Sequence, residues 1–271
     1  MLEQSKVAFI GAGSMAEAII RGMLERKLCR PSNITAADVR RERGQELKKQ
    51  YGIDFAADNP AAVENADVVV LSVKPQNLHQ VLPGLTNRIP EKALVLSIIA
   101  GAKLSTIMDG LAHPAVVRSM PNTPAQVGQG MTVWTAAPSV SESQRSQAKA
   151  LLSALGLEVY VEEERFLDAA TALSGSGPAY VFLFMEALVD AGVKLGFPPA
   201  VAKQLVMQTV KGSAEYAAGS LKDLPALREQ VTSPGGTTAA ALRSFKQDGF
   251  RESIARAVEA AYRRSIELGK G

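Results

Sequence analysis

The chain has 271 residues, of which 46% are hydrophobic and 21% are charged, a composition that excludes a largely disordered protein. The formal net charge of +3 is small, and the densest basic cluster, Arg40-Arg41-Glu42-Arg43, is short and broken by an acid, so we expect no nucleic-acid partner. A single cysteine, Cys29, excludes an intrachain disulfide, and without a Cys/His cluster we expect no metal site.

The first part of the chain alternates strand and helix patterns. Apolar, β-branched runs predict strands at residues 6–10, 33–37, 67–73, 93–99 and 115–119. Helical spacing between them is clearest at residues 14–26 and 40–50. Continuous apolar strands separated by helices indicate a parallel sheet that is covered on both faces. We therefore predict an α/β fold in which residues 1–165 form a Rossmann domain, a doubly wound parallel sheet.

The pattern changes after about residue 165, and from Asp168 onward we expect no strand. Helices are predicted at residues 178–195, 199–218 and 238–268. The first of these carries so few charges that both of its sides need burial, and a partner subunit is the simplest cover. Residues 166–271 are thus expected to form an all-helical dimerisation and substrate-binding domain of an obligate homo-oligomer.

Neither a membrane span nor a secretion signal is expected. The apolar runs at residues 68–73 and 93–102 are too short to cross a bilayer. Residues 1–6 lack the long apolar stretch of a signal peptide. With the single cysteine, this favours a cytoplasmic protein.

The segment Gly11-Ala12-Gly13-Ser14-Met15-Ala16 fits the dinucleotide-binding pattern G-x-G-x-x-G/A. It follows a predicted strand that ends at Ile10, and it opens a predicted helix. In this pattern Gly11 allows the tight turn, Gly13 lets the pyrophosphate approach the backbone, and Ala16 lets the helix pack on the strand. Free N–H groups and the helix dipole then favour the anion. An ordinary tight turn between strand and helix is the alternative.

The end of the second predicted strand reads Ala37-Asp38-Val39-Arg40-Arg41 and should meet the adenosine ribose. An acid there would bind the 2′-hydroxyl of NAD, whereas Arg40 and Arg41 would pair with the 2′-phosphate of NADP. The coenzyme preference therefore stays open, and a solvated helix start remains the alternative for the arginines. Lys74 follows the third strand, where it is either a coenzyme ligand or a solvated loop lysine.

Two Ser/Gly/Pro segments interrupt the helical half. Leu173-Ser174-Gly175-Ser176-Gly177-Pro178 has the signature of a helix start. Thr232-Ser233-Pro234-Gly235-Gly236-Thr237-Thr238 opens another helix, and the N–H groups of Thr237 and Thr238 would point at an anion such as a carboxylate. A plain turn and cap is the alternative for each.

No Ser-His-Asp or Cys-His arrangement is visible, and we expect His79 and His113 on the surface. A reaction that needs little from the protein is favoured, such as hydride transfer to an already reactive imine, in which the coenzyme carries the chemistry.

Taken together, these segments resemble the pyrroline-5-carboxylate reductase family over nearly the whole chain. The matching segments are Phe9-Ile10-Gly11-Ala12-Gly13-Ser14-Met15, Val73-Lys74-Pro75, Met120-Pro121-Asn122-Thr123-Pro124, Leu173-Ser174-Gly175-Ser176-Gly177-Pro178-Ala179-Tyr180 and Ser233-Pro234-Gly235-Gly236-Thr237-Thr238. The resemblance implies NAD(P)H-dependent reduction of 1-pyrroline-5-carboxylate to L-proline. It also implies a C-terminal helical domain that forms interlocked dimers, which often assemble further into decamers.

The resemblance also implies roles for individual residues. Coenzyme contacts are expected from Ile10, Gly11, Ala12, Gly13, Ser14, Met15, Ala37, Asp38, Arg40, Asn59, Val73, Lys74, Ala100 and Asn122. The substrate is expected at Glu164, Ser233, Gly236, Thr237 and Thr238, with Thr238 as the catalytic residue. We expect NADPH as the coenzyme, with NADH as the alternative.

Two other functions fit parts of the sequence. A β-hydroxyacid dehydrogenase shares the plan of a Rossmann domain followed by helices. Enzymes of that kind carry a catalytic lysine soon after a glycine-rich turn, whereas here the helix after Gly177 has no lysine until Lys194. A catalytically silent dinucleotide sensor is the second alternative, and the intact turn at residues 235–238 argues against it.

Overall fold

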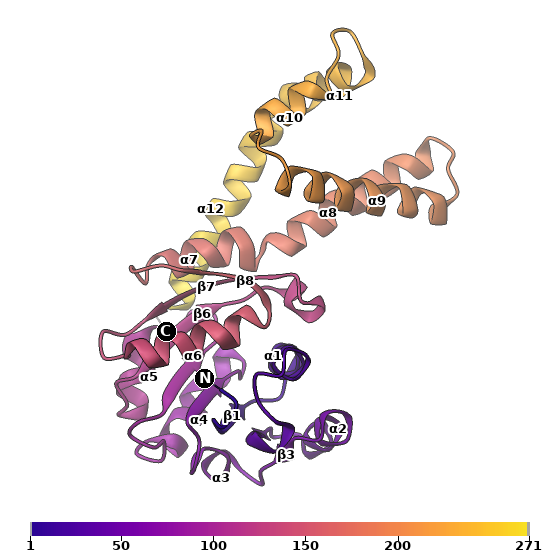
Figure 1. Ribbon diagram of the computed structural model, residues 1–271. Coiled ribbons are helices and arrows are strands. Elements are labelled where there is room, and N and C mark those ends of the chain that lie inside the picture. The colour runs from indigo at the N-terminus through magenta and orange to yellow at the C-terminus, as the bar shows by residue number, and fades with distance from the viewer. Residues whose placement is uncertain (1, 270–271) are drawn as a thin grey trace. The chain divides into compact units, whose positions relative to one another are not determined.

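The structure is a computed structural model that describes residues 2–269, and these divide into two compact units (Figure 1). The first unit contains the chain up to Ser176 and the residues from Ala261 onward. The second unit is Gly177–Ala260. The boundary expected between residues 165 and 166 stays a prediction.

An eight-stranded sheet occupies the first unit among the described residues. Its strands are β1 Val7–Ile10, β2 Ile34–Ala37, β3 Asp54–Phe55, β4 Val68–Leu71, β5 Leu94–Ser97, β6 Val116–Met120, β7 Gly130–Ala136 and β8 Gly156–Tyr160. Its longer helices are α1 Ser14–Glu25, α2 Arg41–Tyr51, α3 Asn59–Val63, α4 Leu78–Leu85, α5 Leu104–Leu111, α6 Glu142–Ser153 and α7 Phe166–Ala170. Short helical turns are η1 Pro31–Asn33, η2 Pro75–Asn77, η3 Thr123–Val127 and η4 Thr171–Gly175.

The strand order is β3-β2-β1-β4-β5-β6-β7-β8. The strands from β1 to β6 run parallel, and β7 pairs with β6 in the antiparallel direction. The chain order reverses at β1, where Ile10 lies in register with Ala37 on one side and Leu71 on the other. In an open parallel sheet, ligands bind outside the carboxyl ends of the strands at such a reversal. The predicted doubly wound Rossmann sheet is confirmed.

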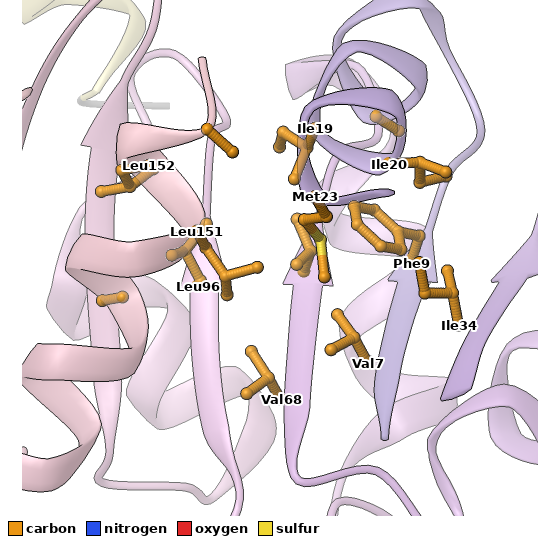
Figure 2. Packing of buried hydrophobic residues seen from close by; sticks show 14 of the residues in the cluster. Val7, Phe9, Ile19, Ile20, Met23, Ile34, Val68, Leu96, Leu151 and Leu152 are labelled. Carbon is orange, nitrogen blue, oxygen red and sulfur yellow. The ribbon is translucent and has the colours of Figure 1, made fainter. Parts of the chain in front are cut away.

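Alternate residues of the strands bury two apolar layers, because successive side chains point to opposite faces of a sheet. Figure 2 shows one layer, in which Ile19 and Met23 of α1 pack near Phe9 and Ile34 of the sheet, and Leu151 of α6 lies on the same face. The opposite layer buries the strand residues Ala8, Ile10, Val69, Leu71, Val95 and Val116 against α3, α4 and α5. This core fixes the strand ends that carry the candidate site.

The predicted strands are all present, but β3, β7 and β8 were not expected. β3 has two residues, and β8 lies at the sheet edge with Leu157 and Val159 exposed, so neither shows a continuous apolar run. His113 was expected on the surface, and this is wrong: it is 5% exposed, and its Nε2 lies 2.8 Å from the carbonyl oxygen of Ala93. That hydrogen bond compensates the burial of the ring.

One helical expectation is wrong, and another is confirmed with an addition. Residues 238–268 are not one helix, because Gly249, with φ of +64°, separates α11 Thr237–Gln247 from α12 Phe250–Leu268. The segment at residues 173–178 does open a helix as expected, because α8 Gly177–Lys194 begins with Gly177 and Pro178. Before that start it contains η4, a π-helical turn closed by a 2.8 Å bond from the N–H of Ser176 to the carbonyl of Thr171, which was not expected. The serines and glycines therefore mark an irregular helical turn at the end of this part of the first unit.

In the described residues of the second unit, all the elements of secondary structure are helices. They are α8 Gly177–Lys194, α9 Pro199–Ala218, α10 Leu224–Gln230, α11 and the start of α12. α8 and α9 pack against each other (Figure 1), yet none of the residues of α8 is buried. Phe182, Leu183 and Leu195 are exposed by 61%, 66% and 82%. An apolar surface of this kind needs a cover.

One stretch of the described residues, Phe166–Lys194, has the length and mean hydropathy of a membrane-spanning helix, with 6% of the most apolar window buried. A helix that packs against a partner subunit on several sides has the same composition.

Candidate active site

The turn between β1 and α1 is held against the loop that follows β4. Gly11 has φ of +95°, a conformation that favours glycine, and a Cβ there would lie 2.9 Å from the backbone carbon and oxygen of Ser72. The Ser72 hydroxyl donates a 2.7 Å hydrogen bond to the carbonyl oxygen of Gly11. Glycine is therefore required at residue 11 because the backbone of Ser72 passes too close to leave room for a side chain.

Gly13 differs from Gly11, because the surrounding protein does not explain it. Its φ of −69° suits any residue, and a Cβ there would have no atom of the described chain within 4 Å. No side chain in the described residues caps α1, which begins at Ser14. A missing side chain and an uncapped helix start are what a bound pyrophosphate needs. The turn thus fits a nicotinamide dinucleotide.

Asp38, at the end of β2, binds this turn directly. Its Oδ2 accepts a 2.9 Å hydrogen bond from the N–H of Ala12, and its Oδ1 accepts one of 2.9 Å from the N–H of Arg40. The Arg40 side chain is 65% exposed, with its Nε 3.4 Å from Asp38 Oδ1. The acid and the arginine that gave opposite signals for the coenzyme therefore lie side by side.

Arg43 has a structural role, unlike the exposed Arg40 and Arg41. Its Nε donates a 2.9 Å hydrogen bond to the carbonyl oxygen of Ala12, and its guanidinium pairs with Glu17. The Tyr51 hydroxyl donates to the other oxygen of Glu17 at 2.9 Å. Partial burial raises the pKa of Glu17. The hydrogen bonds from Arg43 and Tyr51 lower it by a larger amount, so the net pKa lies below its ordinary value. This cluster of Glu17, Arg43 and Tyr51 stabilises the glycine-rich turn through the bond from Arg43 to Ala12.

The other residues expected at the coenzyme follow parallel strands. Asn59 begins α3 after β3, Val73 and the exposed Lys74 follow β4, Ala100 follows β5, and Asn122 follows β6. They therefore lie toward the carboxyl edge of the sheet, where the expected ligand crevice is. The Asn122 side chain already has two protein partners, since it donates to the carbonyl of Ser174 at 3.1 Å and accepts from the N–H of Met131 at 2.9 Å.

Glu164 belongs to the first unit and lies in a polar network. Its Oε1 accepts hydrogen bonds of 2.8 Å from the N–H of Leu104 and from Nη1 of Arg118. Nη2 of Arg118 lies 3.4 Å from Asp168, which also accepts a 2.8 Å bond from the Ser265 hydroxyl. The sequence analysis did not predict that Arg118, Asp168 and Ser265 belong to this network. A charged residue inside the apolar strand Val116–Met120 was the available signal.

The turn before α11 and the start of that helix carry four of the residues expected at the substrate, which are Ser233, Gly236, Thr237 and Thr238. Gly235 has φ of +73°, a conformation that favours glycine. A Cβ at Gly236 would lie 2.8 Å from the Ser233 hydroxyl oxygen and 3.2 Å from the Ser233 carbonyl oxygen, so the turn is tight there. The N–H of Gly236 donates to the carbonyl of Ser233 at 3.1 Å. Like α1, α11 begins without a side-chain cap in the part of the chain that the structure describes, and its first residues are Thr237 and Thr238. This start is suited to an anion.

The residues expected at the coenzyme lie in the first unit, and Ser233, Gly236, Thr237 and Thr238 lie in the second. Within residues 2–269 there is no group of three or more His, Cys, Asp or Glu side chains that could hold a metal ion. Each unit thus contains a helix start without a side-chain cap in the described residues, at Ser14 in the first and at Thr237 in the second.

Comparison with known proteins identifies the family. Residues 164–268 match the family model described as pyrroline-5-carboxylate reductase dimerisation, and residues 6–101 match one described as NADP oxidoreductase coenzyme F420-dependent. A pyrroline-5-carboxylate reductase from Synechocystis sp. is 44% identical, with 98% of each chain covered, and one from Pseudomonas aeruginosa is 42% identical, with 98% of this chain and 97% of the relative covered. The chain belongs to the pyrroline-5-carboxylate reductase family. The resemblance read from the five sequence segments is thereby confirmed.

Solved structures agree with this assignment. A pyrroline-5-carboxylate reductase from Coxiella burnetii superposes with a TM-score of 0.92 at 37% identity, over 99% of this chain and 100% of that one. A pyrroline carboxylate reductase from Plasmodium falciparum, solved with NADP bound, gives a TM-score of 0.90 at 31% identity over the same shares. A prephenate dehydrogenase from A. aeolicus at 13% identity and a TM-score of 0.54 shares the fold alone. The match to a dimerisation domain makes the chain a subunit of a homo-oligomer.

Proposed function

We propose that this protein reduces 1-pyrroline-5-carboxylate to L-proline, the last step of proline synthesis, by hydride transfer to the C=N bond. The observation that carries the proposal is the pair of uncapped helix starts, at Ser14 and Thr237, in a chain that matches reductases of this substrate over its full length. One start suits the pyrophosphate of a dinucleotide, and the other suits the carboxylate of the substrate.

For the coenzyme we propose NADPH, with NADH as the alternative. The NADP in the Plasmodium relative and the exposed Arg40 support this choice. When bound, the coenzyme supplies the hydride. The residues proposed to hold it are Ile10, Gly11, Ala12, Gly13, Ser14, Met15, Ala37, Asp38, Arg40, Asn59, Val73, Lys74, Ala100 and Asn122.

For the substrate we propose that the N–H groups of Thr237 and Thr238 bind the carboxylate and that the Thr238 hydroxyl hydrogen-bonds the ring nitrogen. Ser233 and Gly236 shape the turn around it. Fixing both ends of the ring orients the C=N carbon, so that proximity and orientation supply most of the acceleration. A role of Glu164 at the substrate stays a prediction, because its Oε1 already binds Leu104 and Arg118.

For the assembly we propose a homodimer with interlocked helical domains, and we propose that further contacts between dimers build a decamer. Residues 1–165 are proposed as the dinucleotide-binding domain and residues 166–271 as the dimerisation and substrate-binding domain. The apolar side chains exposed on α8 support a helical interface. We further propose a cytoplasmic location, with neither nucleic acid nor membrane as a partner.

The test is an assay of NAD(P)H oxidation by the purified full chain with 1-pyrroline-5-carboxylate and, separately, with a β-hydroxyacid. Turnover with the imine alone, with L-proline as the product, is expected. Turnover with the hydroxyacid alone would support a hydroxyacid dehydrogenase. Dinucleotide binding without turnover of either substrate would support a silent sensor.

A further inference from the structure

We propose that the end of α12 positions the loop after β5 for coenzyme binding, with Ser265 and Glu164 as the positioning residues. This inference rests on the proposed function, because the loop matters only if a dinucleotide binds at the carboxyl edge of the sheet. The loop is residues 98–103, which connect β5 to α5 and include Ala100. All the contacts below lie within the first unit.

The first connection is a chain of polar contacts. The Ser265 hydroxyl donates to Asp168 Oδ1 at 2.8 Å, and Asp168 lies 3.4 Å from Nη2 of Arg118. Nη1 of Arg118 donates to Glu164 Oε1 at 2.8 Å, and the same oxygen accepts the N–H of Leu104 at 2.8 Å. Leu104 is the first residue after the loop, so the network connects the end of α12 to the point where the loop enters α5.

Burial makes this network specific. The Arg118 side chain is 4% exposed, and breaking a contact of a buried charge is costly because no water replaces it. Within α12, all of which is described, Ser265 is the one buried residue. The helix end is therefore anchored to the first unit by a hydroxyl group with a defined partner, in place of the large apolar side chain that a docking helix usually buries.

The second connection is a close backbone approach. Gly101, at the centre of the loop, has φ of +75°, and a Cβ there would lie 3.3 Å from the carbonyl carbon and the Cβ of Leu268. A Cβ at Gly269 would in turn lie 3.1 Å from the carbonyl oxygen of Gly101. The last turn of α12 thus lies directly against the loop, and glycine at residue 101 permits this approach.

The loop needs such support because one side of it borders open space. A groove of about 610 Å³ is lined by Ile99, Ala100 and Gly101 of the loop, by Leu82 of α4 and by Leu268. A loop beside a groove of this size has room to move unless other contacts fix it. The bond from the N–H of Leu104 to Glu164 at one end of the loop and the close approach of Leu268 to Gly101 at its centre restrict it.

Positioning of this kind predicts a particular kinetic effect. If a variant lets the loop leave its binding-competent position, the apparent dissociation constant for the coenzyme rises in inverse proportion to the competent fraction. The loop belongs to the first unit and the proposed substrate turn to the second, so in Ser265→Ala the Michaelis constant for the imine should not change. Turnover at saturating coenzyme should also be retained, because saturation restores the competent population.

The experiment compares Ser265→Ala and Glu164→Gln with two matched controls in the full-length protein. Ser253→Ala changes an exposed serine of α12 in the second unit, and Glu163→Gln breaks an exposed ion pair with Arg165. NADPH binding is titrated without substrate, and steady-state constants are measured for both reactants. We expect the dissociation constant of NADPH to rise by roughly three- to tenfold in the two test variants, as for a competent fraction between about a third and a tenth. The controls should match the parent protein.

Three results would overturn the inference. The first is an unchanged NADPH dissociation constant in folded Ser265→Ala. The second is a lower turnover number with both Michaelis constants unchanged, which is the sign of a merely structural loss of active protein. The third is a Michaelis constant that rises only for the imine in Glu164→Gln, which is the sign of a direct substrate contact. Should Glu164→Gln fail to fold, Ser265→Ala decides, and failure of the parent protein to bind either coenzyme would refute the proposed function instead.

Discussion

The buried N–H of Ala12 donates a 2.9 Å hydrogen bond to the carboxylate of Asp38, and this bond ties the glycine-rich turn to the end of β2. The two residues are 26 positions apart in the chain. An acid at this position is usually considered a reader of the adenosine ribose. Here Asp38 also fixes the backbone that is proposed to hold the pyrophosphate. A change at Asp38 should therefore affect the binding of both the ribose and the pyrophosphate of the coenzyme.

Asp38→Ala should therefore weaken both coenzymes. The substitution leaves the buried N–H of Ala12 without its acceptor, which costs about 1–3 kcal/mol. Since about 1.4 kcal/mol corresponds to a tenfold change in a dissociation constant, we expect an effect of roughly tenfold. Michaelis constants for NADPH and NADH should both rise by about that factor. A loss confined to NADH would show that Asp38 only reads the ribose hydroxyl. Asp38→Asn, which keeps one acceptor oxygen, should lie between the two proteins.

The two exposed arginines should discriminate between the coenzymes. Replacing Arg40 and Arg41 with alanine removes the charges that would pair with a 2′-phosphate, so the Michaelis constant for NADPH should rise more than that for NADH. Each lost charge-assisted bond is worth about 1.5–3 kcal/mol. The Michaelis constant for NADPH should therefore rise by roughly tenfold or more relative to that for NADH when both arginines are replaced. Arg26→Ala, an exposed arginine at the other end of α1, is the control. Equal effects on both coenzymes would refute the phosphate role.

Thr238→Ala tests the substrate half. Losing the hydroxyl that is proposed to bind the ring nitrogen should lower kcat/KM for the imine by about tenfold to a hundredfold, the range for a bond to a charged group. Thr238→Ser keeps the hydroxyl and should restore most of the activity. Thr209→Ala is a matched control, since its hydroxyl only bonds the carbonyl of Leu205 on α9. Full turnover and substrate affinity in Thr238→Ala would show that the site assignment is wrong.

Leu183, on α8, tests the oligomer. Its side chain is 66% exposed on the chain alone, where a substitution is usually almost neutral. If a partner subunit covers it, Leu183→Lys buries a charge and should shift sedimentation at micromolar concentration toward the monomer. Leu157→Lys, on an exposed residue outside the matched dimerisation segment, is the control. A stable monomer of the unmodified protein at that concentration would contradict the homo-oligomer.

Parts of this structure could be predicted from the sequence because they depend on local patterns. Strands buried on both faces are continuous apolar runs, as Val68–Leu71 shows. The turn from Gly11 to Ala16 combines a motif with a strand before it and a helix after it. β8 was not predicted in this way, because Glu158 lies between Leu157 and Val159, so the strand has no continuous apolar run, and both apolar residues are exposed at the sheet edge.

The remaining features depend on contacts between distant segments. Whether Asp38 meets Ala12, and whether Arg118 meets Glu164, follows from the strand order and not from spacing along the chain. His113 seemed a surface residue because its partner, the carbonyl of Ala93, belongs to another segment. The same limit applies to Arg43, which differs from Arg40 and Arg41 only through the direction in which α2 presents it.

The ion pair between Glu17 and Arg43 predicts a dependence of stability on pH. Burial raises the pKa of Glu17, but the bonds from Arg43 and Tyr51 bring the folded-state pKa below its ordinary value of 4.5. The stabilising contribution is therefore complete above that ordinary value and is lost as the pH falls through the lower, folded-state pKa. At neutral pH it should amount to about 1 kcal/mol or less, because water partly screens the pair.

Thermal unfolding of the parent protein and of Glu17→Gln, at neutral pH and at about pH 3, measures this contribution, since acidic pH protonates an ordinary carboxyl. The parent should be the more stable protein at neutral pH, and the difference between the two should shrink in acid. Glu46→Gln is the control, since Glu46 pairs with the same arginine but is 64% exposed. A difference that stays constant between the two pH values would mean that the charge of Glu17 does not stabilise the cluster of Glu17, Arg43 and Tyr51.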